Sequence, residues 1–157
     1  MTKIIGKYHN IFRHLYQYRF MAATDLCAEM LKHNSQQLDE AMEKRICSAF
    51  MLHLDDTSLD VQGNAVKCIQ KIAPKIREKN LLMIVEKMAE RVVEGEKETR
   101  DIYSMAIRSI NNEINEECAI AMIKSVYPRL VKGITSTNVE VREECLEILA
   151  DIFKRFG

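Results

Sequence analysis

Apolar residues recur along the chain with the three- and four-residue spacing of an amphipathic helix. This spacing places them on one helical face, which would pack against a neighbour. Five glycines and two prolines are too few for a turn-rich β fold, and no run of strict apolar–polar alternation predicts a strand. The pattern therefore predicts an all-α protein. Four apolar stripes are Ile4, Tyr8, Ile11, Phe12 and Leu15; Leu38, Met42, Ile46, Ala49 and Phe50; Leu81, Val85, Met88 and Val92; and Ala119, Ile123, Val126 and Leu130.

Four further helical segments lie between these stripes and share a short pattern. Each has an anchor residue, a packing residue four positions later and an aliphatic residue eight positions later. The anchors Tyr18, Val61, Thr99 and Val141 stand 43, 38 and 42 residues apart. That period is typical of two-helix repeats of about 40 residues. We therefore predict an α-α superhelix, a HEAT-repeat solenoid in which four helical hairpins form a right-handed stack. One domain, 1–157, would hold repeats at about 1–33, 36–75, 78–114 and 115–157.

Stacked hairpins share one continuous core, and we expect their second helices to line a concave ridge that can bind a partner. Polar breaks separate the two helices of the later hairpins at Asp55–Ser58, Glu94–Glu96 and Thr135–Asn138. We expect Thr137 and Glu140 to form a capping box, Pro74 to end a helix and Pro128 to kink one. Gly63 lies inside a predicted helix, where we expect close helix packing and hold docking of a partner's backbone as the alternative.

The composition excludes several classes of function. Lys and Arg balance Asp and Glu at 23 each, so the whole chain has no net field to attract nucleic acid or anionic lipid. No stretch is apolar enough to span a membrane. The start of the chain lacks the features of a signal peptide. Five widely spaced cysteines in apolar patterns are typical of reduced structural thiols, so we expect a cytoplasmic or nuclear protein.

Candidate catalytic and cofactor-binding groups do not converge in the sequence. His9, His14, His33 and His53 lack the spacing of zinc ligands, and the five glycines are isolated, so they form no phosphate-binding loop. We therefore expect no enzyme activity, no cofactor, no metal and no small-molecule substrate.

Charge is uneven at the two ends of the chain. The first 24 residues hold four basic residues and no acidic one, together with half of the aromatic residues, Tyr8, Phe12, Tyr16, Tyr18 and Phe20. Core packing explains the i, i+4, i+8 aromatic spacing better than base stacking, so we do not expect nucleic-acid binding. Near the other end Glu140, Glu143, Glu144 and Glu147 surround Arg142. A solvated helix face is the favoured interpretation, and an acidic strip facing a partner is the alternative. The basic residues are Lys3, Lys7, Arg13 and Arg19.

Four strings resemble the beginning of the cullin-associated, neddylation-dissociated proteins, also called TATA-binding-protein-interacting proteins. They are Tyr18–Leu26, Val61–Ile69, Thr99–Ile102 and Leu146–Phe153. The likeness covers almost the whole chain. It implies a regulator of cullin–RING ubiquitin ligases whose opening repeats hold the C-terminal, RING-bearing end of an unmodified cullin. The family's final repeats, which exchange substrate receptors, have no counterpart, so the resemblance implies binding without exchange.

Two departures from the family pattern change the expectation. The link between the first two helices, near Gln17, is several residues shorter. The chain stops at Gly157, where a further repeat would cover Ile148, Ile152 and Phe156. We therefore expect a truncated form or one part of a split protein, with weak self-association through the uncapped last helix.

Partner contacts are predicted along the second helices at Arg19, Gln62, Lys67, Arg100 and Arg142. Glutamate at Arg100 and Arg142 should then weaken partner binding while leaving helical content intact, whereas Ala65→Glu should unfold the stack. Two other functions stay open: an importin-type adaptor with an acidic groove for basic peptides, and nucleic-acid binding through the basic opening segment.

Overall fold

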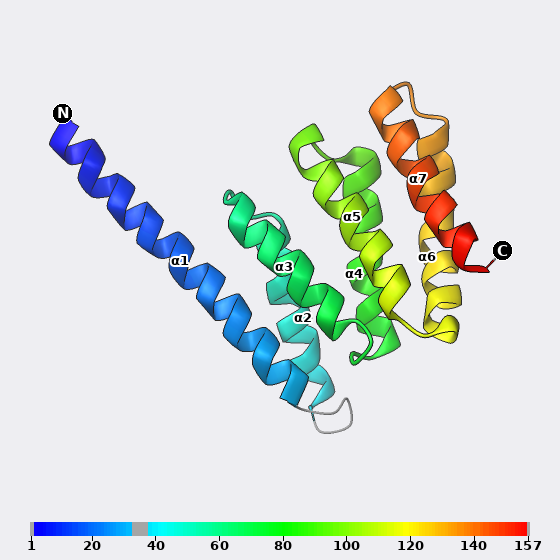
Figure 1. The fold of residues 1–157 in the computed structure, drawn as a ribbon, viewed down its shortest axis with the longest axis horizontal. Helices are drawn as coiled ribbons and strands as arrows, with labels where there is room; N and C mark the ends of the chain where they lie inside the picture. Colours follow the sequence, from blue (N-terminus) through cyan, green and yellow to red (C-terminus); the bar gives the residue numbers. More distant parts are fainter. Residues whose placement is uncertain (1, 33–37, 157) are drawn as a thin grey trace.

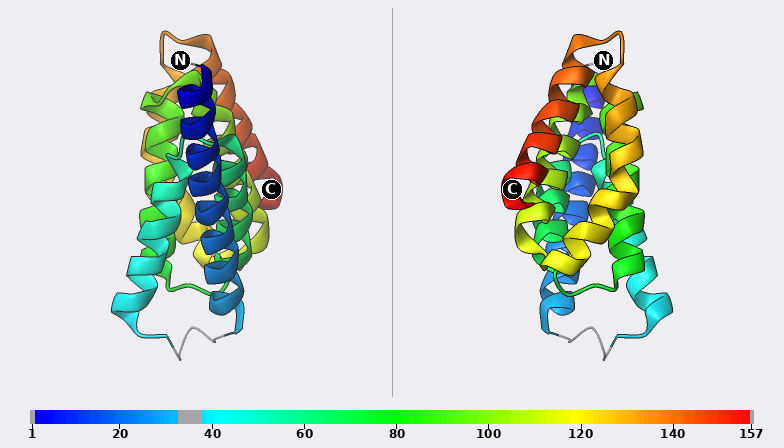
Figure 2. Two further views of the ribbon diagram at one scale, coloured as in Figure 1. Left: turned by 90° about the vertical axis from the view of Figure 1, so that its left-hand side faces the viewer. Right: turned by 90° about the vertical axis from the view of Figure 1, so that its right-hand side faces the viewer.

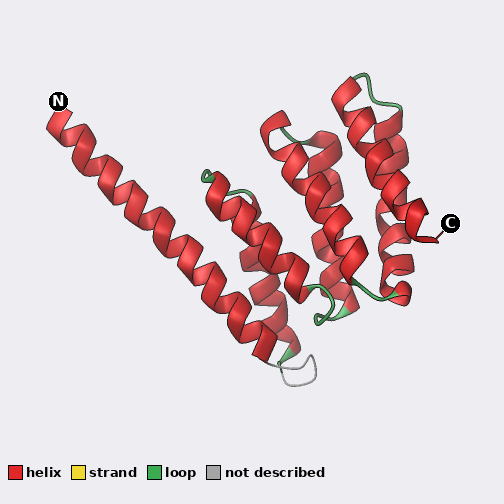
Figure 3. Ribbon diagram, in the orientation of Figure 1, coloured by secondary structure: helices red, strands yellow, loops and turns green. Residues whose placement is uncertain are grey.

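A computed structural model describes the backbone of residues 2–32 and 38–156 and the side chains of residues 15–32 and 38–156. Within this part of the chain there are seven helices and no strand, as Figure 3 shows, so the all-α prediction is confirmed. The helices are α1 (Thr2–Lys32), α2 (Glu40–Leu54), α3 (Leu59–Ile72), α4 (Glu78–Glu94), α5 (Lys97–Glu113), α6 (Glu116–Ile134) and α7 (Val139–Phe156).

The helices form an open stack of two layers. In Figure 1, α2–α3, α4–α5 and α6–α7 are hairpins that follow one another, and α1 lies beside α3. The side views in Figure 2 show two layers. One contains α2, α4 and α6. The other, which we call the second-helix layer, contains α1 and the second helices of the hairpins, α3, α5 and α7. Because α1 and α7 lie at opposite ends, the stack is a superhelix and not a closed bundle.

One hydrophobic core runs through the stack between the two layers. The predicted stripe on α4 is completely enclosed, since Leu81, Val85, Met88 and Val92 are all at most 1% exposed. On α2, Phe50 is fully buried whereas Met42 is 45% exposed. Helical periodicity therefore located most of the core, whereas Met42 is a stripe residue that faces solvent.

The predicted first hairpin is wrong, because one helix, α1, runs without a break through Gln17. Neither glycine nor proline occurs between Arg13 and Phe20, and all residues there tolerate a helical backbone, so nothing stops the helix. The short interhelical link predicted near Gln17 is therefore part of a continuous helix. As Figure 1 shows, the first half of α1 extends past α3 instead of folding back as a separate helix.

The buried face of α1 is also shifted by one residue from the predicted one. The anchor Tyr18 is 67% exposed and Ala22 is exposed, whereas Ala23 and Cys27 are buried against α3. Without a preceding helix of its own to pack on, α1 packs mainly on α3, and the Cys68 thiol lies 3.8 Å from the Ala23 carbonyl oxygen. The aromatic stripe residues Tyr8 and Phe12 fall outside the described side chains.

Helix boundaries agree with most of the sequence signals. The last residue of α3 is two positions before Pro74, and α6 continues through Pro128. The predicted capping box does not form, because the Glu140 carboxylate pairs with Lys97 and the cap of α7 is Asn138. Its side-chain oxygen accepts the Glu140 N–H at 3.0 Å, and its carbonyl accepts the Arg142 N–H at 3.2 Å. Asn is at least as favourable an N-cap as Thr, so α7 can begin one residue later than predicted.

Gly63 does not serve close packing, contrary to the prediction, since a Cβ at this position would meet no atom within 4 Å. We expect Gly63→Ala to raise the free energy of unfolding by about 0.5–1 kcal/mol, because alanine restricts the unfolded chain and favours the helix. Gly133 is the matched control, since its Cβ would lie 2.3 Å from the Cys145 Sγ. Gly133→Ala should cost about 1–3 kcal/mol. Urea denaturation measures both; a destabilised Gly63→Ala protein would contradict this packing.

The final pair of helices presents an apolar end face to solvent, through residues other than those predicted. Ile148 and Ile152 are buried, so the expectation that they lie uncapped is wrong; of the three only Phe156, at 37%, is exposed. The exposed stripe instead contains Leu146 and Phe153, at 51% and 60%. Ile148 and Ile152 lie on the face of α7 that packs on α5 and α6, whereas Leu146 and Phe153 lie on the opposite face.

None of the described helices is long and apolar enough to cross a membrane.

Candidate protein-binding surface

The first turns of the second helices donate hydrogen bonds back to the turns before them. In α3, Gln62 Nε2 donates to the Asp56 carbonyl at 2.6 Å. In α5, Arg100 Nε donates to the Val92 carbonyl at 3.0 Å and Nη2 to that of Gly95 at 2.9 Å. In α7, Arg142 Nη1 donates to the Ser136 carbonyl at 2.8 Å. These side chains satisfy carbonyls of the turns and, for Val92, of the last turn of α4, and so they hold the hairpin turns.

Ion pairs at the same end of the stack join successive repeats. Arg19 of α1 binds both carboxylate oxygens of Asp56, at 2.6 and 3.0 Å. Burial acts to raise the pKa of Asp56, but the hydrogen bond from Arg19 and that from a backbone N–H outweigh it and hold this pKa below its usual value. Glu140 of α7 pairs with Lys97 at 2.7 Å and with Arg100 at 3.4 Å. These ion pairs therefore link α1 to the turn before α3, and α5 to α7.

The five predicted partner contacts do not form one surface. Gln62 and Arg100 are only 4% and 5% exposed and bind their own backbone, so they are structural residues. Arg19 and Arg142 are partly exposed and are engaged with Asp56 and with a loop carbonyl. Lys67 is exposed on α3 and stays a predicted contact.

The acidic segment of α7 is neither a plain solvated face nor a free strip. Glu140 pairs with two cations of α5, and Glu147 Oε2 accepts a hydrogen bond from Arg108 Nη1 at 3.1 Å. Glu143 is exposed, and Glu144 is partly buried toward α5. Half of the cluster therefore joins α7 to α5.

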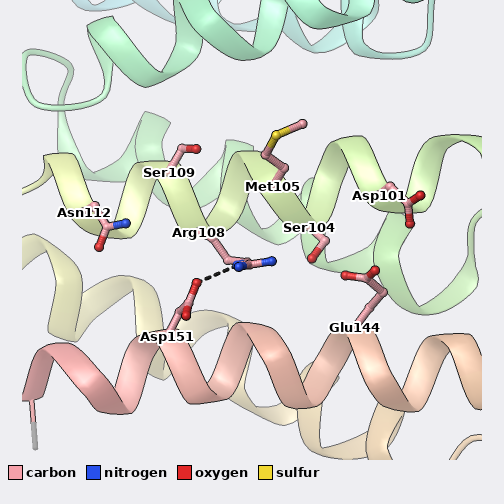
Figure 4. A pocket seen from close by; sticks show the side chains of 8 residues that line it. All are labelled: Asp101, Ser104, Met105, Arg108, Ser109, Asn112, Glu144 and Asp151. Carbon is pink, nitrogen blue, oxygen red and sulfur yellow. Dashed lines mark hydrogen bonds and ion pairs between the residues drawn. The ribbon is translucent and has the colours of Figure 1, made fainter.

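A polar hollow of about 460 Å³ lies between α5 and α7, which we call the α5–α7 hollow. Figure 4 shows Arg108 crossing it toward Asp151, with an Nε–Oδ2 distance of 2.5 Å. The hydrogen bond to Arg108 lowers the pKa of Asp151 below its usual value. The sequence analysis did not predict this pair. Its two opposite charges stand 43 residues apart, which is about one repeat, and that spacing could have indicated a contact between neighbouring repeats. The lining residues are Asp101, Ser104, Met105, Arg108, Ser109, Asn112, Glu144 and Asp151.

The basic opening segment is only partly described. Lys3, Lys7 and Arg13 lie outside the described side chains. Tyr16 packs beside α3, where its hydroxyl donates to Asp60 Oδ2 at 2.9 Å. Tyr16 is partly buried and Tyr18 is exposed, and neither belongs to the hydrophobic core.

The cysteines are free thiols, and four of the five are buried. Burial raises the pKa of Cys47 to about 12 and that of Cys145 to about 11, so these thiols are protonated and unreactive at neutral pH. The described side chains contain no group of three or more His, Cys, Asp or Glu residues able to hold a metal ion. Of the histidines, His53 alone lies among the described side chains.

Comparison with known proteins identifies relatives of this chain. The chain is 31% identical over 142 residues to Cullin-associated NEDD8-dissociated protein 1 of Arabidopsis thaliana. It is 31% identical over 143 residues to the Drosophila melanogaster protein of that name, and 30% over 145 residues to Cullin-associated NEDD8-dissociated protein 2 of Rattus norvegicus. The chain is a homologue of the cullin-associated NEDD8-dissociated proteins. These alignments cover 88–89% of the chain, which confirms the resemblance seen in the sequence.

The chain spans only 11–12% of the length of these cullin-associated NEDD8-dissociated relatives. No family model matches it. Among solved structures, a designed armadillo repeat protein aligns with 85% of the chain and 58% of its own length, with a TM-score of 0.47 and 22% identity.

Proposed function

We propose that this chain is a protein-binding module that holds a cullin–RING scaffold, through its second-helix layer, at the scaffold's C-terminal, RING-bearing end and in its unmodified form. The relationship to proteins named for cullin association carries the proposal. An open stack with one long exposed layer supports it, because repeat solenoids bind partners through such layers. The chain acts by binding and not by catalysis, in the cytoplasm or the nucleus.

Capture of a purified cullin–RING pair that lacks the ubiquitin-like modifier tests this proposal. Immobilised chain should retain the pair at micromolar concentrations, and the single-residue variant Lys67→Glu should retain less of it. No retention at these concentrations would remove the proposal. Gly63→Ala serves as the folded control, because it changes no charge.

We further propose that the exposed apolar face of α7, which contains Leu146 and Phe153, supports weak self-association. Corresponding positions one repeat earlier are covered, since Ser104 and Asn111 of α5 lie 42 residues before Leu146 and Phe153 and are at most 1% exposed. The last pair thus exposes the face that an inner pair buries, and an exposed apolar face of this kind favours association.

Sedimentation velocity should detect this association as a rise in mean mass with protein concentration. Serine at both Leu146 and Phe153 should weaken it at least tenfold, because the exposed apolar area is lost. Leu52→Ser is the matched control, since Leu52 is 73% exposed but lies on α2. Equal masses for wild type and the double variant at every concentration would refute the proposal.

A further inference from the structure

Ion pairs between α5 and α7 follow one face of α7. Glu140, Glu144, Glu147 and Asp151 are spaced four, three and four residues apart, so they share that face. Glu140 is paired with Lys97 and Arg100, whereas Glu147 and Asp151 are both paired with Arg108. Three of the four carboxylates therefore have a cation from α5.

Glu144 is the exception on this face. Within the described side chains it takes part in no ion pair, and neither does Asp101, which lines the same hollow from α5. Figure 4 shows the Glu144 carboxylate directed toward α5 between Asp101 and Ser104. Asp101 is exposed and Glu144 is partly buried. Because the two carboxylates line the same hollow, a further cation between them would be attracted to both.

Ser104 supplies an independent indication of a ligand here. Its side chain lines the hollow and is directed toward α7 in Figure 4, and the residue is only 1% exposed. Within the described part of the chain the hydroxyl oxygen has no hydrogen-bond partner. A buried hydroxyl without a partner costs free energy, so a donor that reaches this oxygen would be favoured.

The neighbouring part of the hollow already holds a cationic side chain of the chain itself. Arg108 lies across it with Nε 2.5 Å from Asp151 and Nη1 3.1 Å from Glu147. Carboxylates of α7 can therefore bind a cationic side chain at the depth of this hollow. One turn toward the start of α5, the lining offers Asp101 and Ser104 and no further cation, while Arg108 also attracts Glu144 electrostatically.

We propose that the Asp101–Ser104–Glu144 end of the α5–α7 hollow binds a lysine or arginine side chain of a partner protein. Asp101 and Glu144 would pair with the cation, and Ser104 would accept a hydrogen bond from it. A basic side chain fits better than a phosphate or nucleic acid, because two carboxylates without partners repel anions. The inference rests on the proposed function only in placing a partner on the second-helix layer.

Fluorescence anisotropy with a labelled octapeptide of alternating lysine and serine tests the inference. At 50 mM salt the wild-type chain should bind this peptide, and a variant with Asp101→Asn and Glu144→Gln should bind it at least fivefold more weakly. The matched control, with Glu98→Gln and Glu143→Gln, removes the same charge from exposed positions of the same two helices outside the hollow. It should change the affinity less than twofold.

Equal weakening by both double variants would overturn the inference, because binding would then follow total charge. No binding of the peptide by the wild type at millimolar concentration would also overturn it. Neutralising the two carboxylates removes a repulsion, so the folded variant should melt no lower than wild type; if it loses helical content, Glu144→Gln alone provides the test. Capture of the cullin–RING pair is measured in parallel. Unchanged capture by the double variant would refute this site alone, whereas failed capture by wild type with intact peptide binding would refute only the proposed function.

Discussion

Replacing Arg100 with glutamate is expected to lower the free energy of unfolding by about 3–5 kcal/mol, because it breaks a buried charge network. Arg100 is 5% exposed and donates to the carbonyls of Val92 and Gly95. Glutamate would leave both carbonyls without this donor and place a second carboxylate beside Glu140. Thermal unfolding followed by circular dichroism should show a melting temperature lower by about 6–20 °C.

This expectation replaces the one drawn from the sequence, in which Arg100→Glu weakens a partner and leaves the fold intact. Lys67→Glu is the charge-matched control, because Lys67 is exposed on the same layer. Its melting temperature should stay within about 2 °C of wild type, as for most surface substitutions. Similar melting temperatures for the two variants would mean that Arg100 does not hold the turn.

Glu43→Ala should be about as destabilising, through a different part of the stack. The Glu43 carboxylate is 1% exposed and accepts three hydrogen bonds: from the Arg77 N–H at 2.7 Å, from its guanidinium at 2.8 Å and from the Asn80 amide at 2.7 Å. Its loss leaves Asn80, which is 2% exposed, without this acceptor, at a total cost of about 3–5 kcal/mol.

Chemical denaturation of Glu43→Ala beside Glu40→Ala isolates this effect. Glu40 lies on the same helix and pairs with Lys79, but both side chains are more than half exposed. Such a surface pair contributes little, so Glu40→Ala should cost less than about 1 kcal/mol. A loss of equal size in the two variants would show that burial of the Glu43 network does not determine its contribution.

The sequence predicted the repeating part of the fold because packing in a solenoid is local. Each pair of helices needs an apolar stripe, and the stripes on α4 and α6 could be found from spacing alone. The start of the chain was mispredicted because periodicity reports an apolar face but not where a helix stops. Near Gln17 no residue forces a break, and only the presence or absence of a partner helix decides the outcome.

The surface was harder to predict than the core because one residue type serves two roles. Arg100 and Lys67 are both basic residues on second helices, yet Arg100 lies under a hairpin turn and Lys67 in solvent. Sequence cannot separate them, since the acceptors of Arg100 are backbone carbonyls that carry no sequence signal. Glu144 illustrates the same limit, because its lack of an ion pair depends on which residue of α5 lies opposite.

Cullin binding by this chain can be measured by titrating it with a purified cullin–RING pair in two forms, unmodified and carrying the ubiquitin-like modifier. We expect micromolar binding of the unmodified pair and at least tenfold weaker binding of the modified one. Absence of binding to either form, or equal affinity for both, would contradict it.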